Sequence, residues 1–164
     1  MPKTLMLLRH AKSSWKDPGC SDHDRPLNKR GKKAAPRMGE LLRKHRLLPD
    51  EILSSTAVRA RTTAAAVAKA SGYAGEVTLR PELYLAAPAS YIDVLRSISG
   101  DPQRVLAVGH NPGIEQLVAH LTGQELAMPT AALAVISLKI ESWEELSVHA
   151  AAELVHFWRP KELD

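Results

Sequence analysis

The chain has 164 residues, of which 45% are hydrophobic and 24% charged, and its formal net charge is +4. This length is typical of one domain with its own core, so we expect a single domain over residues 1–164. The composition excludes a disordered or fibrous protein, and no apolar run approaches the roughly 18 residues of a membrane span. A lone Cys20 and an N-terminus without a signal-peptide pattern predict a cytoplasmic protein that does not bind membranes.

The positive charge favours either a solvated basic surface or an anionic partner. Nucleic acid is the weaker possibility, because the basic residues are spread along the chain apart from residues 29–33 and no aromatic residues alternate with them. One cysteine cannot supply a zinc finger. We therefore expect no nucleic-acid partner, and phosphorylated substrates remain.

The first predicted element is a buried strand at residues 4–9, where six residues form a short, mostly apolar run. A polar loop containing Pro18 and Gly19 follows over residues 12–25. Asn28 is expected to cap the next helix, which has apolar residues at helical spacing and Pro36 either at a kink or in its first turn.

Strands and helices alternate along the rest of the chain. Thr56 is expected to cap the first of the later helices. The alternation predicts an α/β fold, a three-layer α/β/α sandwich in which helices cover both faces of a mostly parallel central sheet. The expected strands are 51–55, 77–79, 104–108, 133–140 and 152–158, and the expected helices are 57–70, 89–97 and 114–121.

Three predicted strands finish close to a cationic or imidazole side chain. Arg9 and His10 end the first strand, Arg59 follows the second at a short distance, and His110 follows the strand at 104–108. Ligands of such sheets bind at the carboxyl ends of the strands, so we expect these four side chains to converge. Without a carboxylate or thiolate they form a poor metal site.

The same four residues suit phosphoryl chemistry. Arginine binds phosphate oxygens through a planar fork of donors, and nearby cations favour the neutral, nucleophilic form of an imidazole. An imidazole nitrogen of His10 can attack phosphorus in line and form a covalent phosphohistidine that water later hydrolyses. Arg9, Arg59 and His110 would stabilise the charge of the transition state.

Four segments resemble the motifs of the histidine phosphatase superfamily, to which phosphoglycerate mutases belong. They are LLRHA at 7–11, RPLNKRG at 25–31, SSTAVRARTTA at 54–64 and VGHNP at 108–112. The short length and the segment RHAKSSW at 9–15 resemble the SixA-type phosphohistidine phosphatase branch. The resemblance implies a single histidine phosphatase domain with a phosphoglycerate mutase-like fold.

The resemblance also implies roles for individual residues. His10 matches the phosphorylated nucleophile, Arg9 and Arg59 match two phosphate-binding arginines, and His110 matches the second pocket histidine. Ser13, in the loop after the nucleophile, is a further candidate for binding substrate. Arg25 is assigned to shaping the loop, and no metal or cofactor is expected.

Two positions depart from the family pattern. Ala11 stands where most members have glycine, so the backbone there should have an ordinary, negative φ. Mutases and many ester phosphatases carry a carboxylic acid that protonates the leaving group, and its position here is occupied by Leu85. Glu82 lies nearby at the wrong offset, and whether it donates a proton stays open.

The missing acid favours a good leaving group. An alkoxide needs a general acid at neutral pH, whereas imidazole, with a pKa of about 6.5, leaves readily. The prediction is a phosphatase acting on phosphohistidine in a protein. The resemblance implies a phosphorelay histidine domain as one such partner. The alternatives are a phosphatase of nucleotides or other small phosphate esters and anhydrides, and a catalytically weak phosphoprotein-binding module.

Overall fold

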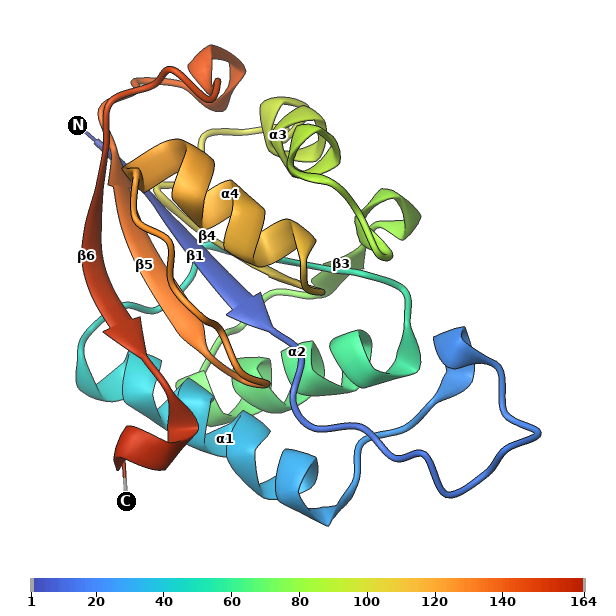
Figure 1. Ribbon diagram of the computed structural model, residues 1–164. Coiled ribbons are helices and arrows are strands. Elements are labelled where there is room, and N and C mark those ends of the chain that lie inside the picture. Colours follow the sequence, from blue (N-terminus) through green and yellow to red (C-terminus); the bar gives the residue numbers. More distant parts are fainter. Residues whose placement is uncertain (1, 164) are drawn as a thin grey trace.

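The computed structural model describes residues 2–163, and its centre is a six-stranded sheet (Figure 1). The strand order is β3-β2-β4-β1-β5-β6, which places β1 and β4 in the middle of the sheet. The predicted strands are confirmed with small shifts, the largest being that β5 ends at Leu138. The strands are β1 (Lys3–Arg9), β2 (Glu51–Ser54), β3 (Val77–Leu79), β4 (Arg104–Gly109), β5 (Leu133–Leu138) and β6 (Ala152–Trp158).

The sheet is mostly parallel, as predicted. β1 pairs in parallel with β4, β4 with β2 and β2 with β3, so the carboxyl ends of these four strands share one edge. β5 runs antiparallel to β1, and β6 antiparallel to β5.

Helices cover both faces of the sheet and complete the predicted three-layer sandwich (Figure 1). Helices α1 (Lys29–Lys44) and α2 (Val58–Ser71) pack on one face, and α3 (Pro88–Arg96) and α4 (Gly113–Thr122) on the other. Within residues 2–163, no helix combines the length and the apolar character needed to cross a membrane. Short 3-10 helices lie in the loops: η1 (Asp22–Asp24), η2 (Pro81–Leu83), η3 (Trp143–Glu145) and η4 (Pro160–Leu163).

The continuous apolar run of β1 follows from its burial on both faces. Leu5 and Leu7 belong to the core beneath α3 and α4, whereas Met6 and Leu8 belong to the core beneath α1 and α2. All four side chains are fully buried. A strand covered on both faces therefore needs apolar residues on both sides, and the charged residues Lys3 and Arg9 lie at its two ends.

The two predicted helix caps have different outcomes. Asn28 caps α1 as predicted, since its side chain accepts a hydrogen bond of 2.9 Å from the Gly31 N–H, and α1 continues through Pro36. The prediction for Thr56 is wrong, because Ala57 occupies the N-cap position of α2 without a side-chain hydrogen bond. The Thr56 hydroxyl instead pairs with His23 Nε2 at 2.9 Å.

The first turn of α1 lies directly against the loop that follows β1. The Asn28 N–H donates to the Lys12 carbonyl at 3.0 Å, and a Cβ atom at Gly31 would collide with the same carbonyl. Glycine at position 31 therefore allows the helix and the loop to approach each other closely. This contact fixes α1 next to the residues that follow His10.

Candidate active site

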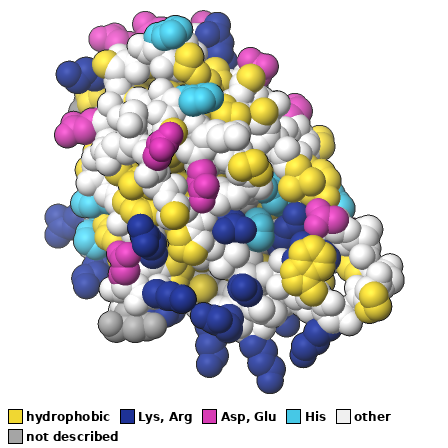
Figure 2. Space-filling view, viewed as in Figure 1, with side chains coloured by type: hydrophobic (Ala, Val, Ile, Leu, Met, Phe, Trp, Pro, Cys, Tyr) yellow, Lys and Arg dark blue, Asp and Glu magenta, His cyan; other side chains and the backbone are white. Residues whose placement is uncertain are grey.

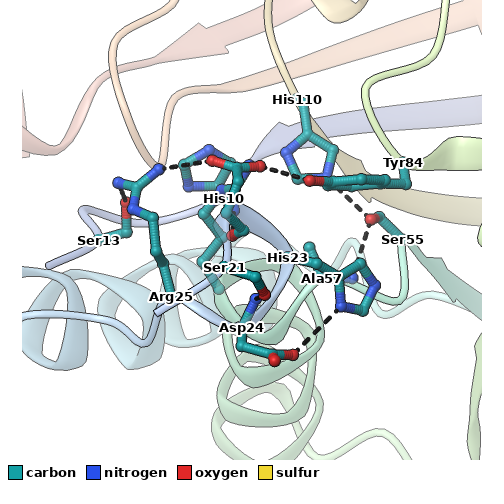
Figure 3. Close-up of polar contacts among 12 residues, drawn as sticks. His10, Ser13, Ser21, His23, Asp24, Arg25, Ser55, Ala57, Tyr84 and His110 are labelled. Carbon is teal, nitrogen blue, oxygen red and sulfur yellow. Dashed lines mark hydrogen bonds and ion pairs between the residues drawn. The ribbon is translucent and has the colours of Figure 1, made fainter. Parts of the chain in front are cut away.

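The four predicted site residues lie together at the carboxyl edge of the parallel strands. Arg9 ends β1 and His10 follows it, Arg59 lies in the first turn of α2, and His110 follows β4. All four line one cavity of about 250 Å³. The two imidazole rings have centroids 5.2 Å apart and planes tilted by 54°, and Figure 3 shows His110 beside Ser55 and Tyr84.

His10 is a buried, neutral imidazole held in one tautomer. Its Nδ1 lies 2.8 Å from the Ala11 carbonyl oxygen, which only accepts hydrogen bonds, so Nδ1 carries the proton and Nε2 keeps its lone pair. Burial, as the largest cause, lowers the pKa of His10 to about 4, and Arg59, Arg9 and Arg25 lower it further while the Ala11 hydrogen bond opposes them. Desolvation therefore lowers the pKa of His10 more than the nearby cations do, although the cations were the cause expected from the sequence.

His110 is still more deeply buried, with 1% of its surface exposed. Its Nε2 lies 2.8 Å from the Ser55 hydroxyl, which also accepts the Ala57 N–H at 3.2 Å. Burial, followed by the charges of His10 and Arg59, lowers the pKa of His110 to about 3. Its Nδ1 is buried and has no hydrogen-bond partner among the described residues.

The two predicted phosphate-binding arginines are held by different partners. Arg9 donates from Nη1 to the Met128 carbonyl at 3.0 Å, while its Nε is buried and unpaired within residues 2–163. Arg59, only 4% exposed, donates from Nη1 to the Asp22 carbonyl at 2.6 Å and from Nη2 to Asp22 Oδ2 at 3.0 Å. Buried donors of this kind are usually satisfied, so the unpaired Nε calls for an acceptor, and Arg9 is among the residues that line the cavity.

Asp22 is the main residue that sequence reasoning missed. Its carboxylate accepts from Arg59, from Arg25 Nη1 at 3.0 Å and from the Tyr84 hydroxyl, and these hydrogen bonds, Tyr84 foremost, hold its pKa below the usual range. It fixes two guanidiniums in place and ties the loop before α1 to α2. The three-residue spacing between Asp22 and Arg25 was the only feature of the sequence that pointed to an ion pair in this loop.

Arg25 lies in the cavity wall as well as in the loop. Its guanidinium donates to the Ser13 hydroxyl (Figure 3), and its Nε donates to the Ser14 carbonyl at 3.2 Å. The exposed Trp15 ring stacks on the same guanidinium at 3.2 Å. Both Arg25 and Ser13 are buried and line the cavity, so the site has a third arginine beyond the two expected.

One further side chain, that of Thr63, joins the loop after β1 to its surroundings. The Ala11 N–H donates to Thr63 Oγ1 at 3.0 Å, and that hydroxyl donates to the Arg59 carbonyl at 2.7 Å. Ala11 has an ordinary φ, as expected; outside glycine, positive φ values within residues 2–163 occur at Arg46, Leu85 and Ala131. Thr63 therefore couples the position of His10 to that of Arg59.

The position expected for a proton-donating acid lies at the cavity. Leu85 lines it with an exposed side chain and a φ of 49°. Glu82 is exposed and does not line the cavity; its carboxylate is paired with Arg80 at 2.8 Å, which lowers the pKa of Glu82. Among the cavity-lining residues none carries a carboxyl group.

Comparisons with known proteins place this chain in a family. The model of the histidine phosphatase superfamily (branch 1) matches residues 5–84. The structure of SixA from Agrobacterium tumefaciens is 32% identical, with a TM-score of 0.82 over 98% of this chain and 99% of that one. The structure of SixA from Nakamurella multipartitia is also 32% identical, with a TM-score of 0.84 over 98% of this chain and 97% of that one.

A third structure shares the fold. It is the protein histidine phosphatase SixA complexed with tungstate, which is 21% identical with a TM-score of 0.80 over 98% of this chain and 99% of that one. With the family model and the two closer SixA structures, the conclusion is direct: the chain belongs to the SixA-type branch of the histidine phosphatase superfamily and is a phosphatase.

Proposed function

We propose that the chain hydrolyses phosphohistidine on a protein and that the phosphoryl group passes through His10. The observation that carries this proposal is a cavity rich in cations without a proton-donating acid: Leu85 takes the acid's place, and Glu82 is paired with Arg80 outside the cavity. Such a site suits a substrate whose leaving group needs little protonation, and imidazole is such a group. The name of the protein histidine phosphatase SixA, solved with tungstate, agrees with this assignment.

Binding of the phosphoryl group would use donors that are now unpaired. Arg9 Nε and His110 Nδ1 are buried without partners, and Arg59 and Arg25 are held in place by Asp22. The Ser55 hydroxyl, which accepts the Ala57 N–H, has its proton to donate to His110 Nε2, and this leaves the proton of His110 on Nδ1. The neutral His110 would then donate to a phosphoryl oxygen.

Transfer would begin at His10 Nε2. This nitrogen attacks phosphorus in line as the bond between phosphorus and the substrate imidazole breaks, and the substrate ring, which carries a solvent proton on its other nitrogen, leaves as neutral imidazole. Water then attacks the phosphoryl group on His10, the new P–N bond breaks, and phosphate leaves with Nε2 unprotonated again. The arginines stabilise the charge on the equatorial oxygens in both steps.

A paired hydrolysis assay tests the proposal. Release of phosphate is measured from a histidine-phosphorylated protein, an aryl phosphate and a nucleoside triphosphate, with the wild type and with His10→Ala. His120→Ala provides the matched control, because His120 is an exposed histidine on α4 away from the cavity. We expect phosphohistidine to be preferred and the His10→Ala rate to fall on the order of 10⁴-fold or more, as when other covalent nucleophiles are removed.

Other outcomes would redirect the assignment. Faster release from the triphosphate would indicate a small-molecule phosphatase with the same chemistry. If phosphate release from every substrate survives in His10→Ala, His10 is not the nucleophile. Release from none of them by the wild type would leave a phosphoprotein-binding module. An alkaline quench with ³²P-labelled substrate, which preserves phosphohistidine, should label the wild type and His120→Ala but not His10→Ala.

A further inference from the structure

A second, larger cavity adjoins the active site. It is an open groove of about 460 Å³ between α1 and η4, and it shares Arg9, Lys12 and Thr130 with the catalytic cavity. The two cavities are therefore neighbours at the end of β1. The groove is lined by Arg9, Lys12, Arg30, Lys33, Ala34, Arg37, Pro129, Thr130, Pro160 and Lys161.

The groove is strongly basic. Six of its ten lining residues are lysine or arginine, and none of the ten is acidic. Figure 2 shows lysine and arginine side chains gathered on this part of the surface, over α1. Such a cluster attracts anions in proportion to their charge and raises the rate at which they arrive.

The cations on α1 form a stripe along one side of the helix. Arg30, Lys33 and Arg37 are spaced i, i+3 and i+7, which places them on one face over about 10 Å at a rise of 1.5 Å per residue. Acidic residues at the same spacing on another helix would lie opposite them. Arg30 and Lys33 are exposed, and neither lines the cavity that holds His10.

The lining favours a protein surface over a nucleotide. None of the ten residues is aromatic, so the groove offers no ring on which a base could stack. Arg30, Lys33 and Lys161 are exposed side chains that project from a helix and from η4, an arrangement suited to the rim of a protein interface, where charges steer association.

We propose that this groove binds an acidic surface next to the phosphohistidine of a partner protein, so that the basic stripe of α1 selects the substrate. This inference rests on the proposed function for its substrate class and adds the feature that distinguishes one phosphohistidine from another. The phosphoryl group enters the cavity of His10 while carboxylates of the partner pair with Arg30, Lys33 and Arg37.

Two helical phosphohistidine peptides provide the probes. They share one sequence, except that one carries glutamates at positions 4, 7 and 11 after the phosphohistidine and the other carries glutamines there. We expect the wild type to prefer the acidic peptide about tenfold in kcat/KM at low salt, and the preference to shrink as salt is added.

The decisive variant is Arg30→Glu/Lys33→Glu, which should abolish or reverse the preference for the acidic peptide. Its matched control is Lys29→Glu/Lys32→Glu, which makes the same charge change in the same turn of α1 with two exposed residues that do not line the groove. We expect the control to keep at least a third of the preference. The ratio between the two peptides is measured within each variant, so a general loss of activity cannot imitate the result.

Failure of the groove inference and failure of the proposed function would give different results. If the wild type hydrolyses both peptides equally, or if the groove variant keeps its preference, the inference is overturned while the proposed function stands. If neither peptide is hydrolysed, the proposed function fails, and fluorescence anisotropy of the unphosphorylated acidic peptide still tests the groove: binding should be lost in the groove variant and kept in the control. If the groove variant loses only the hydrolysis of nucleoside triphosphate, the groove binds a small polyanion instead of a protein surface, and the inference is overturned.

Discussion

The catalytic cavity and the groove beside it hold cations in opposite ways. In the cavity, Arg59 is buried and donates to both the carbonyl and the carboxylate of Asp22. In the groove, Arg30 and Lys33 are exposed on the surface of α1. A buried, anchored guanidinium has a fixed direction, which transition-state stabilisation requires, whereas an exposed cation contributes mainly its charge. The two proposals accordingly assign chemistry to the anchored cations and recognition to the exposed ones.

Charge-conserving substitutions provide the strongest test of that difference. Arg59→Lys keeps the charge but loses the fork that reaches both Asp22 and the phosphoryl group, so kcat/KM for an aryl phosphate should fall roughly 100-fold. Arg30→Lys keeps the positive charge, which is what an exposed cation contributes in the groove. Its kcat/KM for the acidic phosphohistidine peptide should stay within about twofold of the wild-type value. Steady-state kinetics on the two variants check both values. Equal losses would show that the groove also depends on geometry.

The comparison extends to protons, because the cavity keeps two buried histidines neutral. Their pKa values in the folded protein, about 4 for His10 and about 3 for His110, lie below the unfolded value of 6.5. As pH falls below 6.5 the unfolded chain binds protons that the folded protein does not, so stability decreases toward those values. The loss by pH 5 should be about 2 kcal/mol for each histidine.

Denaturant unfolding at pH 7 and pH 5 measures this loss. His110→Gln removes one of the two titrating groups, so its stability should fall less between the two pH values than that of the wild type. His120→Gln, on an exposed position of α4, should behave like the wild type. If His110→Gln loses as much stability as the wild type, the buried histidine is not a source of the pH dependence.

The smallest expected effect concerns the acid that the cavity lacks. Leu85→Glu places a carboxyl group at the cavity in a side chain of similar length, and it should raise hydrolysis of an alkyl phosphate about tenfold relative to that of phosphohistidine. Leu85→Gln has the same shape without the acid and should leave that ratio unchanged. A ratio unaffected by Leu85→Glu would mean that the leaving group does not determine the substrate preference.

Prediction from the sequence worked where a local pattern determines the structure. The apolar run of β1 and the helical spacing in α1 report burial directly, and the carboxyl edge of the sheet then brings Arg9, His10 and His110 together. Arg59 was expected there because it follows the second strand at a short distance, and the resemblance to a family gave the same residue. These signals were sufficient for the fold and for bringing these four residues to one cavity.

The remaining parts of the site depend on contacts between distant segments. Asp22 reaches Arg59 across 37 residues, Ser55 reaches His110 across 55, and Thr63 reaches Ala11 across 52. Each is a small polar residue whose type is common in loops and helix starts, so nothing local distinguishes it. The failed prediction for Thr56 has the same origin, because its hydroxyl pairs with His23 of a distant loop instead of capping α2.

The tight contact at Gly31 has a consequence for partner choice. Because the first turn of α1 rests on the Lys12 carbonyl without an intervening side chain, α1 and the segment carrying His10 are packed in direct contact. In the proposed docking, this contact sets where the backbone of the basic stripe lies relative to His10. A partner would then be selected by the distance between its acidic residues and its phosphohistidine. A side chain larger than glycine at position 31 would push α1 away from the Lys12 carbonyl and change the distance that fits.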